Sequence, residues 1–271
     1  MSQPTGQLKV ERDSEEPGVA LVTIDRAEAR NRLSRAMLEE LRQTCQQLAD
    51  DEDLRVVVIC GRGRDFSVGV DLDDKELNSM VKADLGQRRR MVQTGPRLVA
   101  AIQAMPQTTI VAMQGHCLGG AGCIALAADL RVAGADLKFG MPEVLRGMNM
   151  SWHSVPLMVA HFGPSRTKDL LLTGRFVEAE EAVSWGLANR LAGAGDAAVH
   201  ETALLWAREL AGGVPPMAAS MIKETVNAVA NAHTAMVHMD ADQFLLAQTS
   251  EDFREAMLAF LDKRSPEFKG R

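Results

Sequence analysis

A glycine-rich segment at residues 115–122 offers backbone groups that can do chemistry. Gly119 and Gly120 are adjacent, and two more small residues follow them. A β-branched run at residues 108–111 precedes the segment and an Ala-rich run follows it, which predicts a strand, a tight turn and a buried helix. Uncovered N–H groups at such a helix start can bind an anion or a developing oxyanion. Close packing of the helix on a sheet also needs small residues, so both explanations stand at this point.

Two further loops follow strand-like segments. Residues 54–60 contain a continuous β-branched run at 56–59, typical of a buried parallel strand, and lead into a glycine-containing loop at residues 61–72. A shorter loop follows a strand predicted at residues 137–140 and ends in Glu143. Loops at the ends of buried strands often carry functional residues.

The remaining pattern predicts a mixed α/β core followed by an all-helical tail. Predicted strands are residues 8–12, 19–24, 130–133 and 189–191, and predicted helices follow Ser34 and cover residues 94–105, 150–162 with an interruption at Pro156, 163–172 and 178–185. Residues 75–90 are charged and irregular, with Arg88 to Arg90 interpreted as a solvated helix face rather than a nucleic-acid patch. From about residue 197 only helices are predicted, at residues 200–212, 216–230, 234–246 and 251–263. We therefore divide the chain into a core at 1–195 and a helical region at 196–271, which we expect to form an oligomer interface.

Composition narrows the class of protein. The 271 residues carry a net charge of −6, which disfavours nucleic acid as the main partner. No apolar run is long enough to span a bilayer, and residues 1–18 show neither a secretory nor a transit pattern, so we expect a cytoplasmic location. The four cysteines, Cys45, Cys60, Cys117 and Cys123, have no metal-ligand spacing, so we expect reduced core thiols and no metal.

Several short motifs, in their order and spacing, resemble the crotonase superfamily, the enoyl-CoA hydratase/isomerase family. They are ARNRL at 29–33, VVICG at 57–61, FSVGVDL at 66–72, GHCLGG at 115–120, KFGMPE at 138–143, LLTG at 171–174, EEA at 180–182, WGL at 185–187 and AFLDKR at 259–264. The resemblance extends from residue 19 to residue 269. It implies a spiral of ββα units with a C-terminal all-helical region, assembled as a homotrimer or a dimer of trimers.

The resemblance also implies a substrate and a binding site. The substrate is an acyl-CoA thioester, so coenzyme A is part of the substrate and no separate cofactor is expected. Its carbonyl would accept hydrogen bonds from the N–H groups of Val70 and Gly120, each worth about 3–4 kcal/mol to an enolate. The implied substrate-binding positions are Glu28, Ala29, Arg30, Val68, Asp71, Leu72, Cys123, Asn149, His153, Phe260 and Lys263.

The carboxylates decide the reaction. Hydratases of this family hold a water between two glutamates, and the second of these corresponds to Glu143 while the first is replaced by Cys123. A thiol in an apolar helix is neutral and a weak hydrogen-bond partner. Glu143 alone can move a proton between two carbons, as in an isomerase, or act as the base in a hydration whose water is held otherwise. Candidate helpers are Asp73, Asp74, Glu76, His116 and His153.

We expect hydration of an α,β-unsaturated enoyl-CoA, with double-bond isomerisation or a weakly catalytic CoA-ester-binding protein as alternatives. After Glu143 the family has a glycine-rich run, which this chain replaces with residues that include Asn149, Ser151, Trp152 and His153. We expect these side chains to line the acyl end of the pocket. They favour a bulky, branched or polar acyl group over a simple short-chain one.

Overall fold

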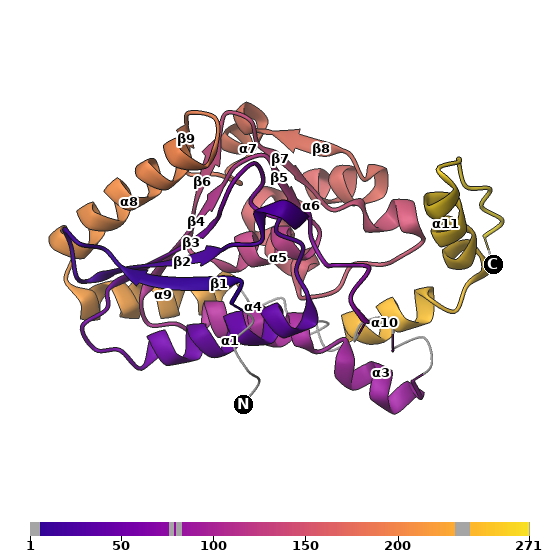
Figure 1. Ribbon diagram of the computed structural model, residues 1–271, viewed down its shortest axis with the longest axis horizontal. Helices are drawn as coiled ribbons and strands as arrows, with labels where there is room; N and C mark the ends of the chain where they lie inside the picture. Colours follow the sequence, from indigo (N-terminus) through magenta and orange to yellow (C-terminus); the bar gives the residue numbers. More distant parts are fainter. Residues whose placement is uncertain (1–5, 76–78, 80–82, 231–238, 271) are drawn as a thin grey trace.

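The structure is a computed structural model that describes residues 6–75, 79, 83–230 and 239–270 (Figure 1). The strands are β1 (Leu8–Arg12), β2 (Val19–Ile24), β3 (Val56–Gly61), β4 (Thr108–Met113), β5 (His116–Leu118), β6 (Leu130–Gly134), β7 (Lys138–Gly140), β8 (Phe176–Glu178) and β9 (Arg190–Ala192). The helices are α1 (Arg35–Ala49), α3 (Leu85–Met91), α4 (Thr94–Gln103), α5 (Gly120–Ala127), α6 (Ser154–Thr173), α7 (Ala179–Trp185), α8 (Asp196–Gly213), α9 (Pro216–Ala230), α10 (Asp240–Ala247) and α11 (Glu251–Asp262), with 3-10 turns η1 (Ala27–Ala29) and η3 (Pro142–Arg146). The predicted α/β class is confirmed.

Six strands form one sheet in the order β1-β2-β3-β4-β6-β9. β1 pairs antiparallel with β2, and the other pairs in this sheet are parallel. Every residue of β3 is buried, as its β-branched run predicts for a parallel strand covered on both faces. Parallel strands place their carboxyl ends along one edge of the sheet, so the loops after β3 and β4 meet there.

Helices cover both faces of this sheet. Val57 and Ile59 of β3 pack in a core with α1, α4 and α5, while Val56 and Val58 pack with α8 on the opposite face. This alternation follows because successive side chains of a strand point to opposite faces. Figure 1 shows α8 on one side of the sheet and α1 and α4 on the other. The helical region at 196–271 therefore begins with a helix that belongs to the packing of the core.

A smaller sheet aligns the two loops that follow β5 and β7. Its order is β5-β7-β8, and β5 pairs parallel with β7. Just beyond β5, the Gly119 N–H donates to the Gly140 carbonyl at 2.9 Å. The start of α5 is thereby held beside η3, the turn that carries Glu143.

The loop after β3 is anchored from the loop after β2 by Asn31. This side chain is fully buried, and its Nδ2 donates to the carbonyls of Arg62 and Asp65 at 2.9 and 2.8 Å. Its Oδ1 accepts the Arg26 N–H at 2.9 Å. The backbone of Asn31 has a positive φ of 54°, a conformation that asparagine tolerates better than most residues. One amide side chain thus fixes the two loops that precede the Val70 segment.

Two expectations about local structure are wrong. Residues 85–91, expected to be irregular, form α3, which starts with a capping box between Asp84 and Gln87. Arg89 and Arg90 are exposed on this helix, in agreement with the solvated helix face expected for Arg88 to Arg90. Two of these arginines also contact the α10 segment: Arg89 pairs with Asp242 at 2.9 Å, and Arg88 contacts Gln248. Pairing between segments far apart in the sequence explains the error.

Pro156 does not interrupt a helix. α6 begins only at Ser154, so the proline lies in its first turn, where no intrahelical N–H bond is lost. The break predicted before Pro164 is present, because Gly163 has a non-helical φ of 80°. Residues 234–238 of the predicted helix at 234–246 lie outside the described residues.

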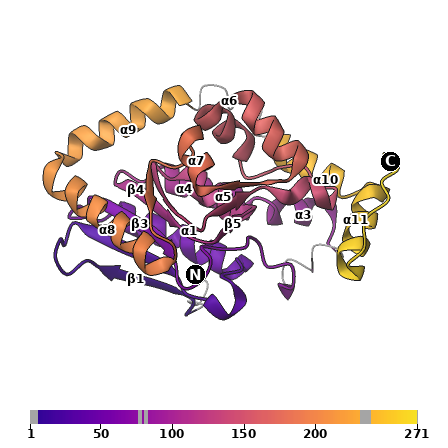
Figure 2. The same ribbon diagram turned by 90° about the horizontal axis from the view of Figure 1, so that it is seen from above.

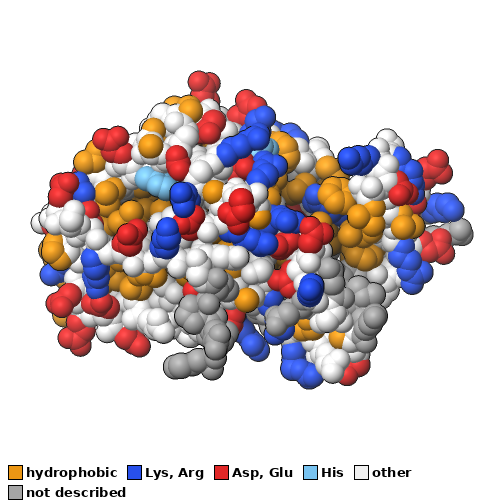
Figure 3. Space-filling view, in the orientation of Figure 1, with side chains coloured by type: hydrophobic (Ala, Val, Ile, Leu, Met, Phe, Trp, Pro, Cys, Tyr) orange, Lys and Arg blue, Asp and Glu red, His pale blue; other side chains and the backbone are white. Residues whose placement is uncertain are grey.

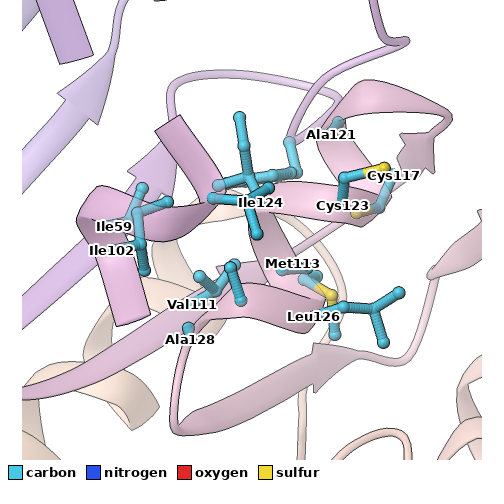
Figure 4. Close-up of a cluster of buried hydrophobic side chains, with 14 of the residues drawn as sticks. Ile59, Ile102, Val111, Met113, Cys117, Ala121, Cys123, Ile124, Leu126 and Ala128 are labelled. Atoms are coloured by element: carbon cyan, nitrogen blue, oxygen red, sulfur yellow. The ribbon is translucent and has the colours of Figure 1, made fainter. Parts of the chain in front are cut away.

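The cysteines are free and buried, as predicted. Burial raises the pKa of Cys45 to about 12 and that of Cys60 to about 11. Figure 4 shows Cys117 and Cys123 within a cluster of buried hydrophobic side chains. None of the helices within the described ranges is both long and apolar enough to cross a membrane.

Candidate active site

The loop after β3 runs beside β5 and brings Val70 next to Gly120. The Ser67 N–H donates to the His116 carbonyl at 3.0 Å, and the Leu118 N–H donates to the Ser67 carbonyl at 3.1 Å. A Cβ placed on Gly120 would lie 3.2 Å from Cγ2 of Val70. The two residues predicted to form the oxyanion hole are therefore neighbours.

The N–H groups of Val70 and Gly120 are available to a ligand. The Gly69 carbonyl and the Asp71 N–H both bond to Leu33, so the N–H of Val70 points away from that partner. Gly120 is the first residue of α5, whose initial N–H groups have no acceptor within the helix. In the described part of the chain, neither N–H donates a hydrogen bond. Together they form a pair of backbone donors suited to an enolate or thioester oxygen.

Glycine is required at two positions beside these donors. Gly69 has a φ of 91°, and a Cβ there would lie 2.7 Å from the Leu118 carbonyl oxygen. Gly119 has a φ of 55°, and a Cβ there would lie 2.7 Å from Oε1 of Glu143. Any side chain at Gly119 would therefore displace this carboxyl group. Of the two explanations for the glycine-rich segment, close packing accounts for Gly122, whose Cβ would lie 2.6 Å from Cε of Met141.

Glu143 directs its carboxyl group toward the start of α5. It lies in the first turn of η3, directly after Pro142, whose fixed φ suits the first helical position. The residue is partly exposed, but its Oε2 atom is buried and has no hydrogen-bond partner among the described residues. Burial raises its pKa to about 7, although the charge of Arg146 lowers it in part. A carboxyl group with such a pKa can both accept and donate a proton near neutral pH.

Cys123 cannot replace the missing carboxylate. Its side chain is 2% exposed and belongs to the main hydrophobic core (Figure 4). Burial and the nearby charge of Glu143 raise the pKa of the thiol well above its usual value. The thiol is therefore neutral at physiological pH, as the sequence predicted, and it offers no second acid or base.

These groups surround a cavity of about 190 Å³. It is lined by Val68, Gly69, Val70, Leu72, Leu118, Gly119, Gly120, Cys123, Pro142, Glu143, Arg146, Met148, Met150, Ser151, Trp152 and Phe244. Among these lining residues Glu143 is the only one with a carboxyl group, and Arg146 is the only one with a cationic side chain. The cavity thus combines an apolar wall, two backbone donors and one titratable carboxyl group.

Two predicted residues lie elsewhere. Asn149 and His153, expected at the acyl end, do not line the cavity. The Asn149 amide donates to Oε1 of Gln243 at 3.0 Å, and the His153 N–H donates to Oδ2 of Asp240 at 2.8 Å. Both residues are hydrogen-bonded to the segment around α10, whereas Ser151 and Trp152, which lie between them in the sequence, line the cavity.

Of the predicted coenzyme A positions, Val68 lines the cavity, and the others are absent from its lining. Glu28 and Ala29 belong to η1 at the surface, and the Arg30 guanidinium is paired with Asp65 at 2.8 Å. Phe260 and Lys263 lie at the end of α11, where the Phe260 ring packs 4.8 Å from the Arg146 guanidinium. Figure 3 shows exposed hydrophobic side chains gathered over the α11 end of this face.

Asp71 forms ion pairs with two arginines outside the cavity. Its carboxylate is buried and pairs with Arg26 at 2.7 Å and with Arg32 at 3.0 Å. These contacts keep the pKa of Asp71 below its usual value despite burial. Asp71 therefore holds the loop that presents Val70, and it does not face the cavity.

The candidate helpers are occupied by other contacts. The Asp74 carboxylate accepts the Arg35 N–H, Asp73 pairs with Arg32, and the His116 imidazole contacts Asp65 at 2.7 Å. Glu76 lies outside the described residues.

Sequence reasoning missed Arg146 and Phe244. Arg146 follows Glu143 by three residues, a spacing that places both on one side of a helical turn and could have identified it. Phe244 comes from α10, and no sequence motif connects that helix with the loops that line the cavity.

Comparisons with known proteins agree with this geometry. The sequence profile of the family described as enoyl-CoA hydratase/isomerase matches residues 14–271. A probable enoyl-CoA hydratase from Bacillus subtilis is 31% identical over 252 residues, which is 93% of this chain and 95% of the relative. A 2,3-dehydroadipyl-CoA hydratase from Escherichia coli is 32% identical over 263 residues, which is 95% of this chain and 98% of the relative.

Solved structures extend the similarity to three dimensions. An enoyl-CoA hydratase from Mycobacterium avium subsp. paratuberculosis superposes with a TM-score of 0.80 at 26% identity, covering 98% of this chain and 100% of the other. A putative enoyl-CoA hydratase from Streptomyces coelicolor gives a TM-score of 0.77 at 29% identity, covering 100% of this chain and 97% of the other.

The raised pKa of Glu143 predicts how folding stability depends on pH. The folded protein keeps this proton up to about pH 7, whereas the unfolded chain loses it near the usual value of 4.5. The contribution of Glu143 to stability is therefore full below pH 4.5 and is lost as pH rises through 7. The free energy of unfolding of Glu143→Gln, measured relative to that of wild type, should therefore rise by up to about 3 kcal/mol between pH 4.5 and pH 8.

Denaturant unfolding at the two pH values measures this difference, and comparing the two cancels the constant cost of burying the amide. Glu180→Gln, at an exposed position, is the matched control and should show no such change. An equal effect of Glu143→Gln at both pH values would contradict the raised pKa.

Proposed function

The chain belongs to the enoyl-CoA hydratase/isomerase family, and we propose that it hydrates an α,β-unsaturated enoyl-CoA with Glu143 as its acid–base group. The crotonase fold expected from the motifs is confirmed by the solved relatives. One observation carries the proposal: among the residues that line the cavity there is one carboxyl group, its pKa is raised to about 7, and it lies beside two backbone N–H groups that donate no hydrogen bond within the described residues. The names of the relatives, several of them enoyl-CoA hydratases, favour hydration as the reaction.

The proposed hydration needs only this carboxyl group. The thioester oxygen accepts hydrogen bonds from Val70 and Gly120, which draws electrons away from the C2=C3 bond. Ionised Glu143 takes a proton from water while the water oxygen bonds to C3, and the electron pair of the double bond moves into an enolate. Neutral Glu143 then returns the proton to C2. The net change is the addition of one water, and Glu143 regains its charge.

Isomerisation is the second candidate, because Cys123 leaves the cavity with one carboxyl group. In this reaction Glu143 would take a proton from C2 of a 3-enoyl-CoA and return it to C4. The enolate would be held by the same two N–H groups. No water would enter the product.

Other expectations stay predictions. Arg30 and Lys263 are proposed to contact phosphates of coenzyme A, with Glu28, Ala29 and Phe260 nearby. That no metal or separate cofactor takes part, that nucleic acid is not a partner, and that the protein works in the cytoplasm are likewise untested.

We also propose that α9 forms part of the contact between subunits of a trimer or a dimer of trimers. No residue of α9 is buried, and five large apolar side chains on it are mostly exposed: Met217 (76%), Met221 (61%), Ile222 (64%), Val226 (58%) and Val229 (72%). In Figure 2, α9 lies at the outer edge of the molecule. An apolar helix face of this kind is typical of a subunit interface.

Replacing Glu143 with Gln should lower kcat by about 10²–10⁴-fold, because the amide cannot accept the transferred proton. The absorbance of a conjugated enoyl thioester should fall on hydration, and the product should contain oxygen from labelled water. Glu180→Gln is again the control. A gain of conjugation from a 3-enoyl-CoA without label would identify the isomerase, and tight binding without either reaction would identify a binding protein. Full activity of Glu143→Gln would exclude both catalytic assignments.

Ile222→Asp should dissociate the assembly, because a charge would be buried at the interface. Light scattering coupled to size exclusion measures the mass, which should be a multiple of three chains for wild type and smaller for the variant. Leu172→Asp, at an apolar position on α6 that is 72% exposed, is the control and should leave the mass unchanged. A monomeric wild type, or an unchanged mass for Ile222→Asp, would contradict the proposal.

A further inference from the structure

The indole of Trp152 is fixed in a space that two glycines leave open. A Cβ on Gly95 of α4 would lie 1.8 Å from Cε2 of Trp152, and a Cβ on Gly120 would lie 2.9 Å from its Cη2. Glycine in a helix is unfavourable by about 1 kcal/mol relative to alanine, so Gly95 needs a reason, and the indole supplies it. Trp152 therefore packs between the starts of α4 and α5, directly beside an oxyanion donor.

The backbone around Trp152 resists rotation of this side chain out of its place. Trp152 and His153 both have positive φ values, 60° and 59°, which are strained for such residues. The His153 N–H is held by Asp240, and α6 begins at the next residue. Trp152 also packs against the main hydrophobic core. These contacts describe a fixed wall rather than a mobile side chain.

A second cavity, of about 510 Å³, lies beside the one that contains Glu143. It is bounded by residues of α1, α3, α4, α10 and α11, among others, and the two cavities share Val70, Leu72, Met148, Ser151, Trp152 and Phe244 as lining residues. Its volume is in the usual range for a ligand site, whereas the 190 Å³ around Glu143 is below that range. Trp152 and its neighbours thus separate a small reaction cavity from a larger apolar one.

We propose that Trp152 is the residue that restricts this enzyme to short-chain acyl thioesters, by closing the larger cavity to the acyl chain. The inference rests on the proposed function, because it assumes that the acyl group leaves the thioester beside Gly120. It narrows the substrate class to an acyl group of a few carbons, because the cavity beside Glu143 is small, and so it replaces the expectation from residue types alone that a bulky acyl group is preferred over a short one. Branching within those few carbons is compatible with it. The substitution of the family's glycine-rich run by bulkier residues thus shortens the acyl site.

The test compares acyl chain lengths in wild type, Trp152→Phe and Trp152→Ala. Binding of saturated butanoyl-, octanoyl- and dodecanoyl-CoA is measured by calorimetry, and kcat/KM is measured with the matching 2-enoyl thioesters. Wild type should prefer the four-carbon chain. Trp152→Ala should raise the dodecanoyl-to-butanoyl ratio of affinities at least tenfold, since each methylene newly buried is worth about fourfold. Trp152→Phe should give a smaller shift in the same direction.

Trp185→Ala is the matched control, because Trp185 packs against Phe162 on α6 and does not line either cavity. It should leave the chain-length ratio unchanged. Trp152→Phe keeps the inference testable if Trp152→Ala does not fold. Equal ratios in wild type and Trp152→Phe, or a wild type that prefers the twelve-carbon chain, would overturn it.

The saturated thioesters separate this inference from the proposed reaction. They bind without being hydrated or isomerised, so a shifted affinity ratio supports the role of Trp152 even where no turnover is found. Turnover that depends on Glu143 but is indifferent to chain length in every variant would overturn the role of Trp152 and leave the proposed function intact.

Discussion

The arrangement depends on the carboxyl group of Glu143, which is partly exposed but has one buried oxygen without a hydrogen-bond partner among the described residues. Oε2 of Glu143 has no hydrogen bond among the described residues, and burial raises its pKa to about 7. An isolated buried carboxylate is costly, so the group stays partly protonated at neutral pH. That cost is what makes Glu143 a proton donor and acceptor of nearly balanced strength. A second carboxylate at position 123 would change this balance, and the neutral thiol of Cys123 avoids it.

The fold places this group by aligning loops at one edge of a parallel sheet. β3 and β4 end together, and the loops beyond them are joined through Ser67 and Leu118. Asn31 anchors the first of these loops, and the Gly119–Gly140 hydrogen bond sets α5 beside η3. Because the proposed oxyanion donors are backbone N–H groups on packed segments, we expect them to need no reorganisation when charge develops on a substrate.

The sequence predicted best what local pattern controls. The β-branched run of β3, the Ser34 cap of α1 and the glycines beside the oxyanion donors were all identified from neighbouring residues. Glu143 was recognised only through the spacing of family motifs, since nothing local reveals a buried carboxyl group. Apart from Pro156, whose error concerned where α6 begins, the errors involve contacts between distant segments. α3 is docked on α10, and the segment around α10 also draws Asn149 and His153 away from the cavity. That Gly95 leaves the space occupied by the Trp152 indole is likewise visible only in three dimensions.

The central claim is that Glu143 moves a proton at C2 of a thioester whose oxygen is held by Val70 and Gly120. Hydrogen–deuterium exchange at C2 of butanoyl-CoA tests it most directly, because this saturated thioester can be neither hydrated nor isomerised. We predict that wild type incorporates deuterium at C2 at a rate that rises with pH to an inflection near 7, and that Glu143→Gln is at least about 100-fold slower. Exchange by Glu143→Gln at the wild-type rate, or an inflection near the usual carboxyl value of 4.5, would contradict the account.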